Sequence, residues 1–356
     1  MNRKERNAHK CQNLGVLCSL NARKYSGSTQ MTPKRIIIDT DPGIDDALTF
    51  LLALASPEIQ LEGITTTQGN VTIEKATRNA LAVLELLGAS HTPVAKGCSL
   101  PIVARLGSAA QAGGLLLASD LVHGQSGLGN ANLPDPKAKP VSLHAIDYLI
   151  ERFLAEPGEL SLFAIGPLTN VALAIRKESR FAKAVKEMVI MGGSIREGGN
   201  VTPQAEFNIF TDPYAAHIVF HSGIPITLIP LDVTHKCMLM LEQIQNLGKL
   251  NTPISHFIAD ATSVYVNYTE SKTGVKGCAL HDPLTLATVI APELLTFEEH
   301  YVDVDISGGL SQGNTFADFY RTTGKPANMK VALDVRGDNF VELFLQRMEV
   351  LTTDER

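Results

Sequence analysis

The sequence predicts an α/β fold with an open, mostly parallel sheet and helices on both of its faces. Two observations carry this prediction. From residue 34 onward, short apolar runs alternate with helical patterns, as in strands that are joined by crossover helices. No linker rich in Pro, Gly or Ser divides the chain, so we expect a single domain over residues 33–356.

The expected elements follow one another in a regular order. The first strand is the β-branched run 35–38, and an apolar helix over 45–54 follows it. Further strands are expected at 59–66, 160–165, 187–191, 224–229, 301–306 and 329–335. Further helices are expected at 73–87, 170–175 and 340–350, and at the helix-start pairs 212–213 and 282–283. In such sheets ligands bind at the carboxyl ends of the strands, where unusual polar residues cluster.

Composition narrows the class of protein. The formal net charge of -6 argues against a nucleic-acid partner, and no apolar run is long enough to span a bilayer. The five cysteines are scattered without a C-x-x-C pair, which argues against a disulfide framework or a zinc site. We therefore expect a cytoplasmic protein with reduced thiols.

The first thirty residues differ from the rest in composition. They hold six Lys or Arg residues against one acid, Glu5, and they lack a clear periodicity. An organelle transit peptide has such a composition. We favour a disordered basic tail over residues 1–32, or an upstream start codon with Met31 as the true first residue.

An acidic cluster follows the first strand. Asp39, Asp41, Asp45 and Asp46 lie within eight residues, with a Pro-Gly turn between the two pairs. Carboxylates this close repel one another unless a cation compensates, and a hard divalent ion bound by oxygens is the natural solution. The alternative is that Asp41 caps a turn and Asp45 caps the helix, which accounts for only part of the cluster.

A phosphatase is a second interpretation of the same residues. Asp39 and Asp41 have the Asp-x-Asp spacing of haloacid-dehalogenase phosphatases, where the first supplies the nucleophile and the second the acid. Those enzymes have Thr or Val two residues beyond the second Asp, and Gly43 stands there instead. We rank this interpretation lower.

The segment 39–46, Asp-Thr-Asp-Pro-Gly-Ile-Asp-Asp, resembles the N-terminal signature of the inosine–uridine-preferring nucleoside hydrolase family. Other matching segments follow in the family's order: 69–70, 123–129, 166–170, 191–193, 199–203, 205–209, 212–213, 231–235, 281–283 and 324–328. The resemblance implies a Rossmann-like nucleoside hydrolase domain that cleaves the N-glycosidic bond of purine or pyrimidine ribonucleosides with a calcium-activated water. It also implies a homodimer or homotetramer.

The resemblance assigns the metal site and the attacking water to particular residues. Asp41, Asp46 and Asp282, with the backbone carbonyl of Ile165, match the ligands of a calcium ion. Asp41 also matches the general base, and Asn70 a residue that assists the water. Asp45 matches the residue that holds the ribose 2'-hydroxyl beside the metal.

The resemblance also assigns a ribose-binding wall. Asn200 and Glu206 correspond to residues that hold the 5'-hydroxyl, and Asn208 to one that holds the 2'- and 3'-hydroxyls. By the same resemblance, we expect Met191 to pack on the sugar and Phe207 to belong to the same wall. Hydroxyl contacts of this kind tighten as the sugar takes on oxocarbenium character.

Three histidines are candidates for the base end of the substrate. His281, beside Asp282, matches the family's proton donor to the leaving base, a suitable role for an imidazole. His235 matches a position near the active site of broad-specificity members, and His123 lies on a loop that resembles the family's mobile one. For His235 and His123, a structural role is an equally good interpretation.

Other residues receive structural interpretations. His217 and His221 are four apart on one helix and suggest a metal pair, but no third ligand is visible in the sequence, so we interpret them as ordinary helix residues. Asp212 is expected to cap its helix. Tyr265 and Tyr268 lie in a helical segment, and we do not assign them to the site.

A third hypothesis is a catalytically silent protein that binds ribonucleosides or ribose on the same fold. Loss of Asp41, Asp45 or Asp282 would indicate such a protein. All three residues are present.

Overall fold

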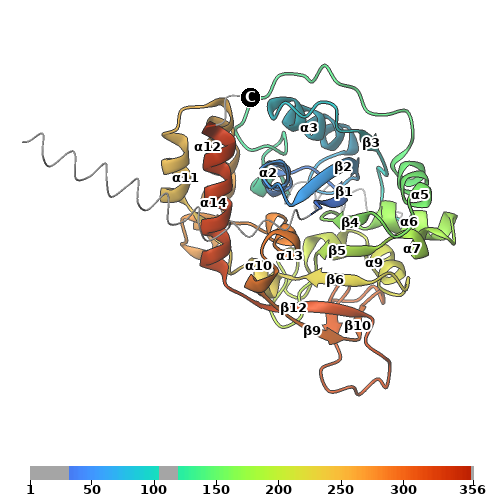
Figure 1. Ribbon diagram of the computed structural model, residues 1–356. Helices are drawn as coiled ribbons and strands as arrows, with labels where there is room; N and C mark the ends of the chain where they lie inside the picture. The colour runs from blue at the N-terminus through green and yellow to red at the C-terminus, as the bar shows by residue number, and fades with distance from the viewer. Residues whose placement is uncertain (1–31, 104–118, 354–356) are drawn as a thin grey trace, which may run out of the picture. The chain divides into compact units, whose positions relative to one another are not determined.

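The computed structural model describes residues 32–103 and 119–353, so the tail expected over residues 1–32 lies outside the described residues except for its last residue. From Lys34 onward, the described residues form one compact unit, built on the sheet that is shown with its helices in Figure 1. Within the described ranges, the main sheet has eight strands in the order β3-β2-β1-β4-β5-β6-β12-β9. Their bounds are β1 Lys34–Thr40, β2 Ile59–Thr66, β3 Val94–Lys96, β4 Ser161–Ala164, β5 Glu187–Met191, β6 Ile226–Ile229, β9 Leu295–His300 and β12 Met329–Val335.

The sheet is mostly parallel, as the alternating sequence pattern predicts. Every neighbouring pair is parallel except β12 with β9, which is antiparallel. Successive side chains of a strand point to opposite faces, and β1 follows this rule: Ile36 and Ile38 belong to one apolar cluster and Ile37 to another. All three side chains are fully buried, which explains the continuous β-branched run.

Helices cover the two apolar clusters on opposite faces of the sheet (Figure 1). One face carries α2 (Ile44–Leu54), α3 (Ile73–Leu86), α11 (Leu241–Gly248), α12 (Pro253–Thr273) and α14 (Gly337–Thr353). The other carries α5 (Ala145–Ala155), α6 (Thr169–Lys177), α7 (Phe181–Ala184) and α9 (Pro213–Phe220). No helix in the described ranges combines the length and the apolar character that crossing a membrane requires.

Two expectations from the sequence were wrong in detail. The strand expected at 301–306 is shorter, β10 (Val302–Val304), and it pairs with β11 (Thr315–Ala317) in a separate hairpin outside the main sheet. The helix expected after Asp282 is a short 3-10 turn, η1 (Pro283–Leu286), followed by α13 (Ala287–Ile290) and η2 (Pro292–Leu294). The hydroxyls of Thr285 and Thr288 bond to nearby carbonyls, and Pro292 cannot continue a helix, so no long helix forms here.

The remaining short elements bring distant segments to the carboxyl edge of the sheet. α8 (Phe207–Thr211) and α10 (Leu231–Thr234) follow β5 and β6, and β7 (Met238–Met240) pairs antiparallel with β8 (Gly277–Ala279). This pairing fixes the chain just before His281 and Asp282. Their side chains therefore meet the residues that follow β1, although about 240 residues separate the two segments.

Candidate active site

A cavity of about 860 Å³ opens at the carboxyl edge of the sheet. Twelve of the fourteen residues that the sequence nominates line this cavity: Asp45, Asn70, His123, Ile165, Met191, Asn200, Glu206, Phe207, Asn208, His235, His281 and Asp282. The other two, Asp41 and Asp46, are fully buried directly beside it. The topology thus gathers one pocket from separate stretches of the chain, with a size typical of small-molecule sites.

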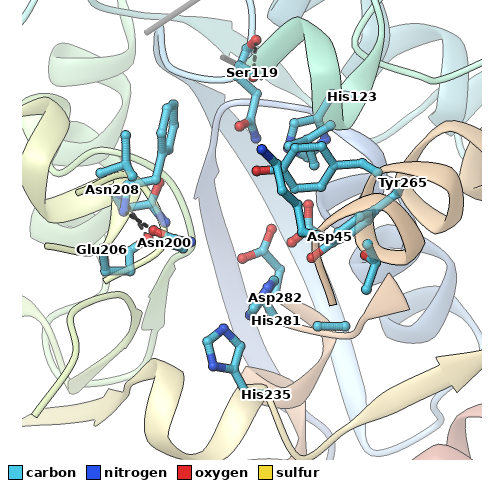
Figure 2. A pocket seen from close by; sticks show the side chains of 18 of the residues that line it. Asp45, Ser119, His123, Asn200, Glu206, Asn208, His235, Tyr265, His281 and Asp282 are labelled. Carbon is cyan, nitrogen blue, oxygen red and sulfur yellow. Dashed lines mark hydrogen bonds between the residues drawn. The ribbon is translucent and has the colours of Figure 1, made fainter. Parts of the chain in front are cut away.

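The pocket has two differently composed sides. Figure 2 shows Asn200, Glu206 and Asn208 on one side, with His123 and Tyr265 facing them across the opening. Asp282 lies between the two sides. A ligand in this pocket therefore meets carboxylates and amides on one side and aromatic rings on the other.

Acidic side chains gather at the floor of the pocket. One carboxylate oxygen each from Asp45, Asp46 and Asp282 lie within 4.8 Å of one another. Burial raises the pKa of Asp282 well above its usual value, and the neighbouring carboxylates of Asp45, Asp46 and Asp41 raise it further. Burial, and then the charge of Asp46, likewise raises the pKa of Asp45 to about 8. The carboxylates thus repel one another in a site that solvent does not screen.

Asp46 is held by the start of its own helix. Its Oδ2 accepts hydrogen bonds from the Gly43 N–H at 2.8 Å and from Asn70 Nδ2 at 3.2 Å, and its Oδ1 accepts from the Thr40 hydroxyl. The helix begins at Ile44, so it is Asp46 rather than Asp45 that makes the capping contact. The capping alternative therefore accounts for Asp46 alone and leaves Asp41, Asp45 and Asp282 unexplained.

Asp41 is fixed by a single backbone contact and is enclosed by glycines. Its Oδ2 accepts from the Asn70 N–H at 2.7 Å, whereas its Oδ1 is buried without a hydrogen-bond partner among the described residues. A Cβ atom at Gly69 would lie 1.9 Å from Oδ2, and one at Gly166 would lie 2.5 Å from Oδ1. Only glycine allows the backbone to approach this carboxylate so closely. Burial, followed by the charge of Asp46, raises the pKa of Asp41 well above its usual value.

This donor set fits a hard divalent cation. Several buried carboxylates converge, one oxygen of Asp41 has no partner in the part of the chain that the structure describes, and the carboxylates raise one another's pKa values. Buried carboxylates without a compensating charge destabilise the folded state, and a cation that prefers oxygen ligands would offset that loss of stability. No nitrogen or sulfur ligand belongs to the trio of Asp45, Asp46 and Asp282.

Glu206 and Asn208 order the wall beside the acidic floor. The Glu206 carboxylate caps α8 by accepting from the backbone N–H groups of Asn208 and Ile209, and it also accepts from the Gly193 N–H at 2.9 Å. Asn208 Nδ2 donates to the carbonyl oxygens of Ile165 at 3.0 Å and of Met191 at 3.3 Å. Both side chains are thus held in place by backbone groups at the ends of β4 and β5.

The rings of His123 and Tyr265 lie across the pocket from this wall, and those of His235 and His281 lie toward its floor. Tyr265 lies 6.4 Å from His281 in a stacked arrangement and 6.2 Å from His123, measured between ring centroids. The rings of His235 and His281 are 5.6 Å apart. Flat aromatic surfaces at such spacing suit a planar ligand group such as a nucleobase.

Hydrogen bonds and burial determine the protonation of the histidines. His123 Nδ1 accepts from the Ile44 N–H at 3.1 Å, and His281 Nδ1 lies 2.7 Å from the Thr234 hydroxyl. Burial lowers the pKa of His123 to about 4 and that of His281 to about 3, and it also lowers the pKa of His235. In the structure without a ligand, all three imidazoles are therefore neutral near neutral pH.

Sequence reasoning missed several residues that shape this pocket. Thr234 holds His281, Ser119 donates to the Asn70 carbonyl at 2.7 Å, and Tyr265 forms part of the wall. The motif 231–235 includes Thr234, so its position next to His235 was the available signal. For Tyr265 the available signal was its helical segment, where the resembling family often places base-stacking groups, whereas nothing in the sequence near Ser119 distinguishes it from other helix residues.

The interpretation of His217 and His221 needs correction. The sequence offers no third ligand near them, but the structure places Asp303 of β10 against both. One ligand atom from each of the three lies within 4.8 Å of the other two. The third residue was invisible because it comes from a strand more than eighty positions away. Asp212 caps α9 as expected, since its side chain accepts from the Ala215 N–H at 3.0 Å.

Comparison with known proteins agrees with the fold and the pocket. The model of the family described as inosine-uridine preferring nucleoside hydrolase matches residues 36–342. The pyrimidine-specific ribonucleoside hydrolase RihA of Photobacterium profundum is 41% identical over 315 residues, which cover 88% of this chain and 98% of the relative. A solved purine-preferring ribonucleoside hydrolase from Gardnerella vaginalis is 36% identical with a TM-score of 0.83, covering 90% of this chain and 99% of its own. The plant nucleoside hydrolase PpNRh1 is 34% identical with a TM-score of 0.81, covering 91% of this chain and 100% of its own.

These matches, over a shared fold, define the class of protein as an enzyme that hydrolyses N-glycosyl bonds of ribonucleosides. The chain belongs to the inosine-uridine preferring nucleoside hydrolase family. The resemblance inferred from the acidic motif is thereby confirmed, as is the α/β fold.

Proposed function

We propose that this enzyme hydrolyses ribonucleosides to free base and ribose with water and a bound Ca²⁺ ion, and that pyrimidine nucleosides are its preferred substrates. The observation that carries the proposal is the Oδ1 of Asp41, which lies among converging buried carboxylates and has no hydrogen-bond partner within residues 32–103 and 119–353. Relatives that are 38–41% identical over nearly their whole length are named pyrimidine-specific, which supports the base preference. A relative that is 36% identical is named purine-preferring, so the test below compares pyrimidine with purine nucleosides.

The proposed ligands of the ion are Asp41, Asp46 and Asp282, with the carbonyl of Ile165. Carboxylate and carbonyl oxygens suit calcium, with water completing the coordination. When bound, the ion would supply positive charge that lowers the pKa of a water molecule and compensates the carboxylates. The tight trio of Asp45, Asp46 and Asp282 supports a cation at this floor.

We assign proton transfer and sugar binding to side chains of the pocket. Asp41 is the proposed base that accepts the proton of the attacking water, with Asn70 held against it by the 2.7 Å bond. We assign Asp45, which lines the pocket beside Asp46 and Asp282, to accept from the ribose 2'-hydroxyl. We assign the 2'- and 3'-hydroxyls also to Asn208 and the 5'-hydroxyl to Asn200 and Glu206, with Met191 and Phe207 against the sugar. Such contacts accelerate the reaction where they tighten in the transition state.

The leaving base requires a proton. Because the imidazoles around it are neutral near neutral pH, the donor must take up a proton from solvent before it passes one to the base. His281 is the proposed donor, with His235 beside it and His123 and Tyr265 enclosing the base. Tyr265 enters this proposal from the structure rather than from the sequence. A base that departs neutral is a better leaving group than its anion, which is why a general acid matters here.

The phosphatase hypothesis has no support at Asp39. Its carboxylate is fully buried and does not line the cavity, and its Oδ1 accepts from the Thr65 hydroxyl and from Asn170 Nδ2. A nucleophile must reach its substrate, and Asp39 instead ties β1 to β2 and α6.

The test is an assay of ribose release from uridine, cytidine, inosine and adenosine by the full chain with Ca²⁺. We expect hydrolysis, a higher kcat/KM for uridine and cytidine, and loss of activity with a calcium chelator that added Ca²⁺ reverses. Asp41→Asn should lower kcat by about a thousand-fold or more because the base is lost. The matched control Asp260→Asn, at an exposed position, should leave kcat unchanged.

Each outcome bears on a different part of the proposal. Full activity in Asp41→Asn would overturn the assigned base. Binding of uridine without ribose release would favour the silent binding protein. Equal or better kcat/KM for inosine would overturn the pyrimidine preference alone. Phosphate release from phosphate monoesters would revive the phosphatase hypothesis.

A further inference from the structure

A second cluster of metal-ligating side chains lies outside the active-site pocket. His217 lies in α9, His221 is the C-cap residue that follows this helix, and Asp303 belongs to β10. The ligand atoms of the three residues lie within 4.8 Å of one another, and none of the three lines the cavity. All three side chains remain partly accessible, so an ion could reach them from solvent.

The separations within this cluster are close to those of a metal site. His217 Nδ1 lies 3.0 Å from Asp303 Oδ1, and His221 Nε2 lies 3.5 Å from Asp303 Oδ2. Ligands about 2.1 Å from a tetrahedral ion are themselves about 3.4 Å apart. Little rearrangement is therefore needed to close the three side chains around one ion.

The orientation of His221 is the independent evidence for a ligand. Its Nδ1 lies 2.8 Å from the carbonyl oxygen of His217, and a carbonyl can only accept, so Nδ1 carries the hydrogen. The other ring nitrogen, Nε2, faces Asp303 Oδ2 at 3.5 Å and the Tyr301 hydroxyl at 3.2 Å. Metal-ligating histidines are held in this way, with the second ring nitrogen donating to a carbonyl or carboxylate.

Hydrogen bonds from neighbouring residues also fix the Asp303 carboxylate. It accepts at Oδ1 from the Val304 N–H at 2.9 Å and at Oδ2 from the Tyr301 hydroxyl at 2.6 Å. Tyr301 in turn accepts from Lys325 Nζ at 2.6 Å. Although burial opposes it, these hydrogen bonds hold the pKa of Asp303 below its ordinary value, so the carboxylate stays ionised. A hydrogen-bonded, ionised carboxylate is the state in which Asp303 can bind a metal.

We propose that His217, His221 and Asp303 form a second metal site that binds a divalent transition-metal ion such as Zn²⁺, with water in the remaining positions. Two imidazoles exclude Ca²⁺ and Mg²⁺ as the natural occupants, because those ions prefer oxygen ligands. The ion would tie α9 to the β10–β11 hairpin. That hairpin contacts the segment after β5, which leads to the wall of Glu206 and Asn208. Thr315 Oγ1 accepts from the Ser194 N–H and donates to the Ser194 carbonyl.

The test titrates Zn²⁺ calorimetrically into the full chain saturated with Ca²⁺, which keeps the acidic floor of the active site occupied. We expect a binding event that weakens by about 100-fold or more in His217→Ala and His221→Ala. The matched control His256→Ala, an exposed histidine on α12, should bind Zn²⁺ as the wild type does. Unchanged Zn²⁺ binding in both cluster variants would overturn the site.

A second measurement separates a metal site from an ion-paired cluster. Co²⁺ bound by these residues should show the strong visible absorption of a low-coordinate ion, and Asp303→Asn should abolish it while keeping a side chain of the same shape. Zn²⁺ should also raise the melting temperature of the wild type but not of the double variant His217→Ala/His221→Ala. If Asp303→Asn leaves the Co²⁺ spectrum unchanged, or if Zn²⁺ raises both melting temperatures equally, the proposal fails.

Discussion

Asn208 donates a hydrogen bond of 3.0 Å from its Nδ2 to the backbone carbonyl of Ile165. This contact joins the wall proposed to bind ribose to the carbonyl proposed as a calcium ligand. Asn208 follows β5 and Ile165 follows β4, two neighbouring parallel strands whose carboxyl ends meet. Substrate binding and metal binding are therefore expected to depend on each other through this amide.

Replacing Asn208 by Ala should weaken both functions together. The variant loses a hydroxyl-binding amide and leaves the Ile165 carbonyl less well oriented. We expect the KM for uridine to rise and the apparent affinity for Ca²⁺ to fall, each by about 10- to 100-fold. Activity measured across a series of Ca²⁺ and uridine concentrations checks both. The exposed Asn246→Ala serves as control, and a change in KM at unaltered Ca²⁺ affinity would contradict the coupling.

The glycine beside Asp41 offers a steric test of the site. In Gly166→Ala the new Cβ would meet Asp41 Oδ1 at 2.5 Å, so either the carboxylate or the β4–α6 loop must shift. We expect kcat/KM to fall by about 100-fold or more, because small displacements at a reacting centre are costly.

The matched control for this steric test is Gly248→Ala. The nearest atom to its new Cβ would be Ala259 Cβ at 3.8 Å, an ordinary contact between the end of α11 and α12. This variant should keep full activity and gain slightly in thermal stability, since alanine favours a helix over glycine. Activity assays and melting curves of the two variants check this prediction. A fully active Gly166→Ala would show that Asp41 is not held as described.

Thr234 is expected to position His281 for proton donation. Thr234→Val keeps the shape of the side chain but removes the hydroxyl that lies 2.7 Å from His281 Nδ1. We expect kcat for uridine to fall by about 10-fold or more, in the range ascribed to general acid catalysis. A nitrophenyl riboside, whose leaving group needs no proton, should be hydrolysed at the wild-type rate. Equal losses with both substrates would indicate a structural role for Thr234 instead.

The sequence revealed those features of the fold and the site that are local in the chain. The buried run that includes Ile36 and Ile38 and the acidic segment after it are contiguous, so the first strand and the adjoining carboxylates could be recognised directly. The edge strand β9 was missed because its burial pattern alternates only weakly and half of its side chains face solvent. Edge strands lack the continuous apolar run that marks a buried strand.

Contacts that depend on tertiary packing could not be predicted. Asp282 was placed with the acidic motif only through resemblance to a family, since no periodicity links residues so far apart. Tyr265 reaches the pocket because α12 packs over it, and Asp303 reaches His217 because the β10–β11 hairpin lies against α9. In each case the partner is determined by how elements pack, which a single sequence does not encode as a local pattern.

His123 should make the stability of the enzyme depend on pH. Burial lowers its folded-state pKa to about 4, whereas an unfolded histidine titrates near 6.5, so between these values the unfolded chain binds more protons. Stability therefore rises with pH through this window, is fully present above about pH 6.5, and is lost as pH falls toward 4. Between pH 7 and pH 5, the free energy of unfolding should fall by about 2 kcal/mol through this histidine.

The variant His123→Asn isolates this contribution. Its Oδ1 can still accept from the Ile44 N–H, the contact that His123 Nδ1 makes at 3.1 Å, but it cannot be protonated. Urea unfolding of the Ca²⁺-saturated proteins near pH 7 and near pH 5 should show a smaller loss of stability in the variant than in the wild type. The exposed His256→Asn should lose as much as the wild type does. If His123→Asn loses as much as the wild type, the histidine is protonated in the folded state and cannot accept the Ile44 hydrogen bond at low pH.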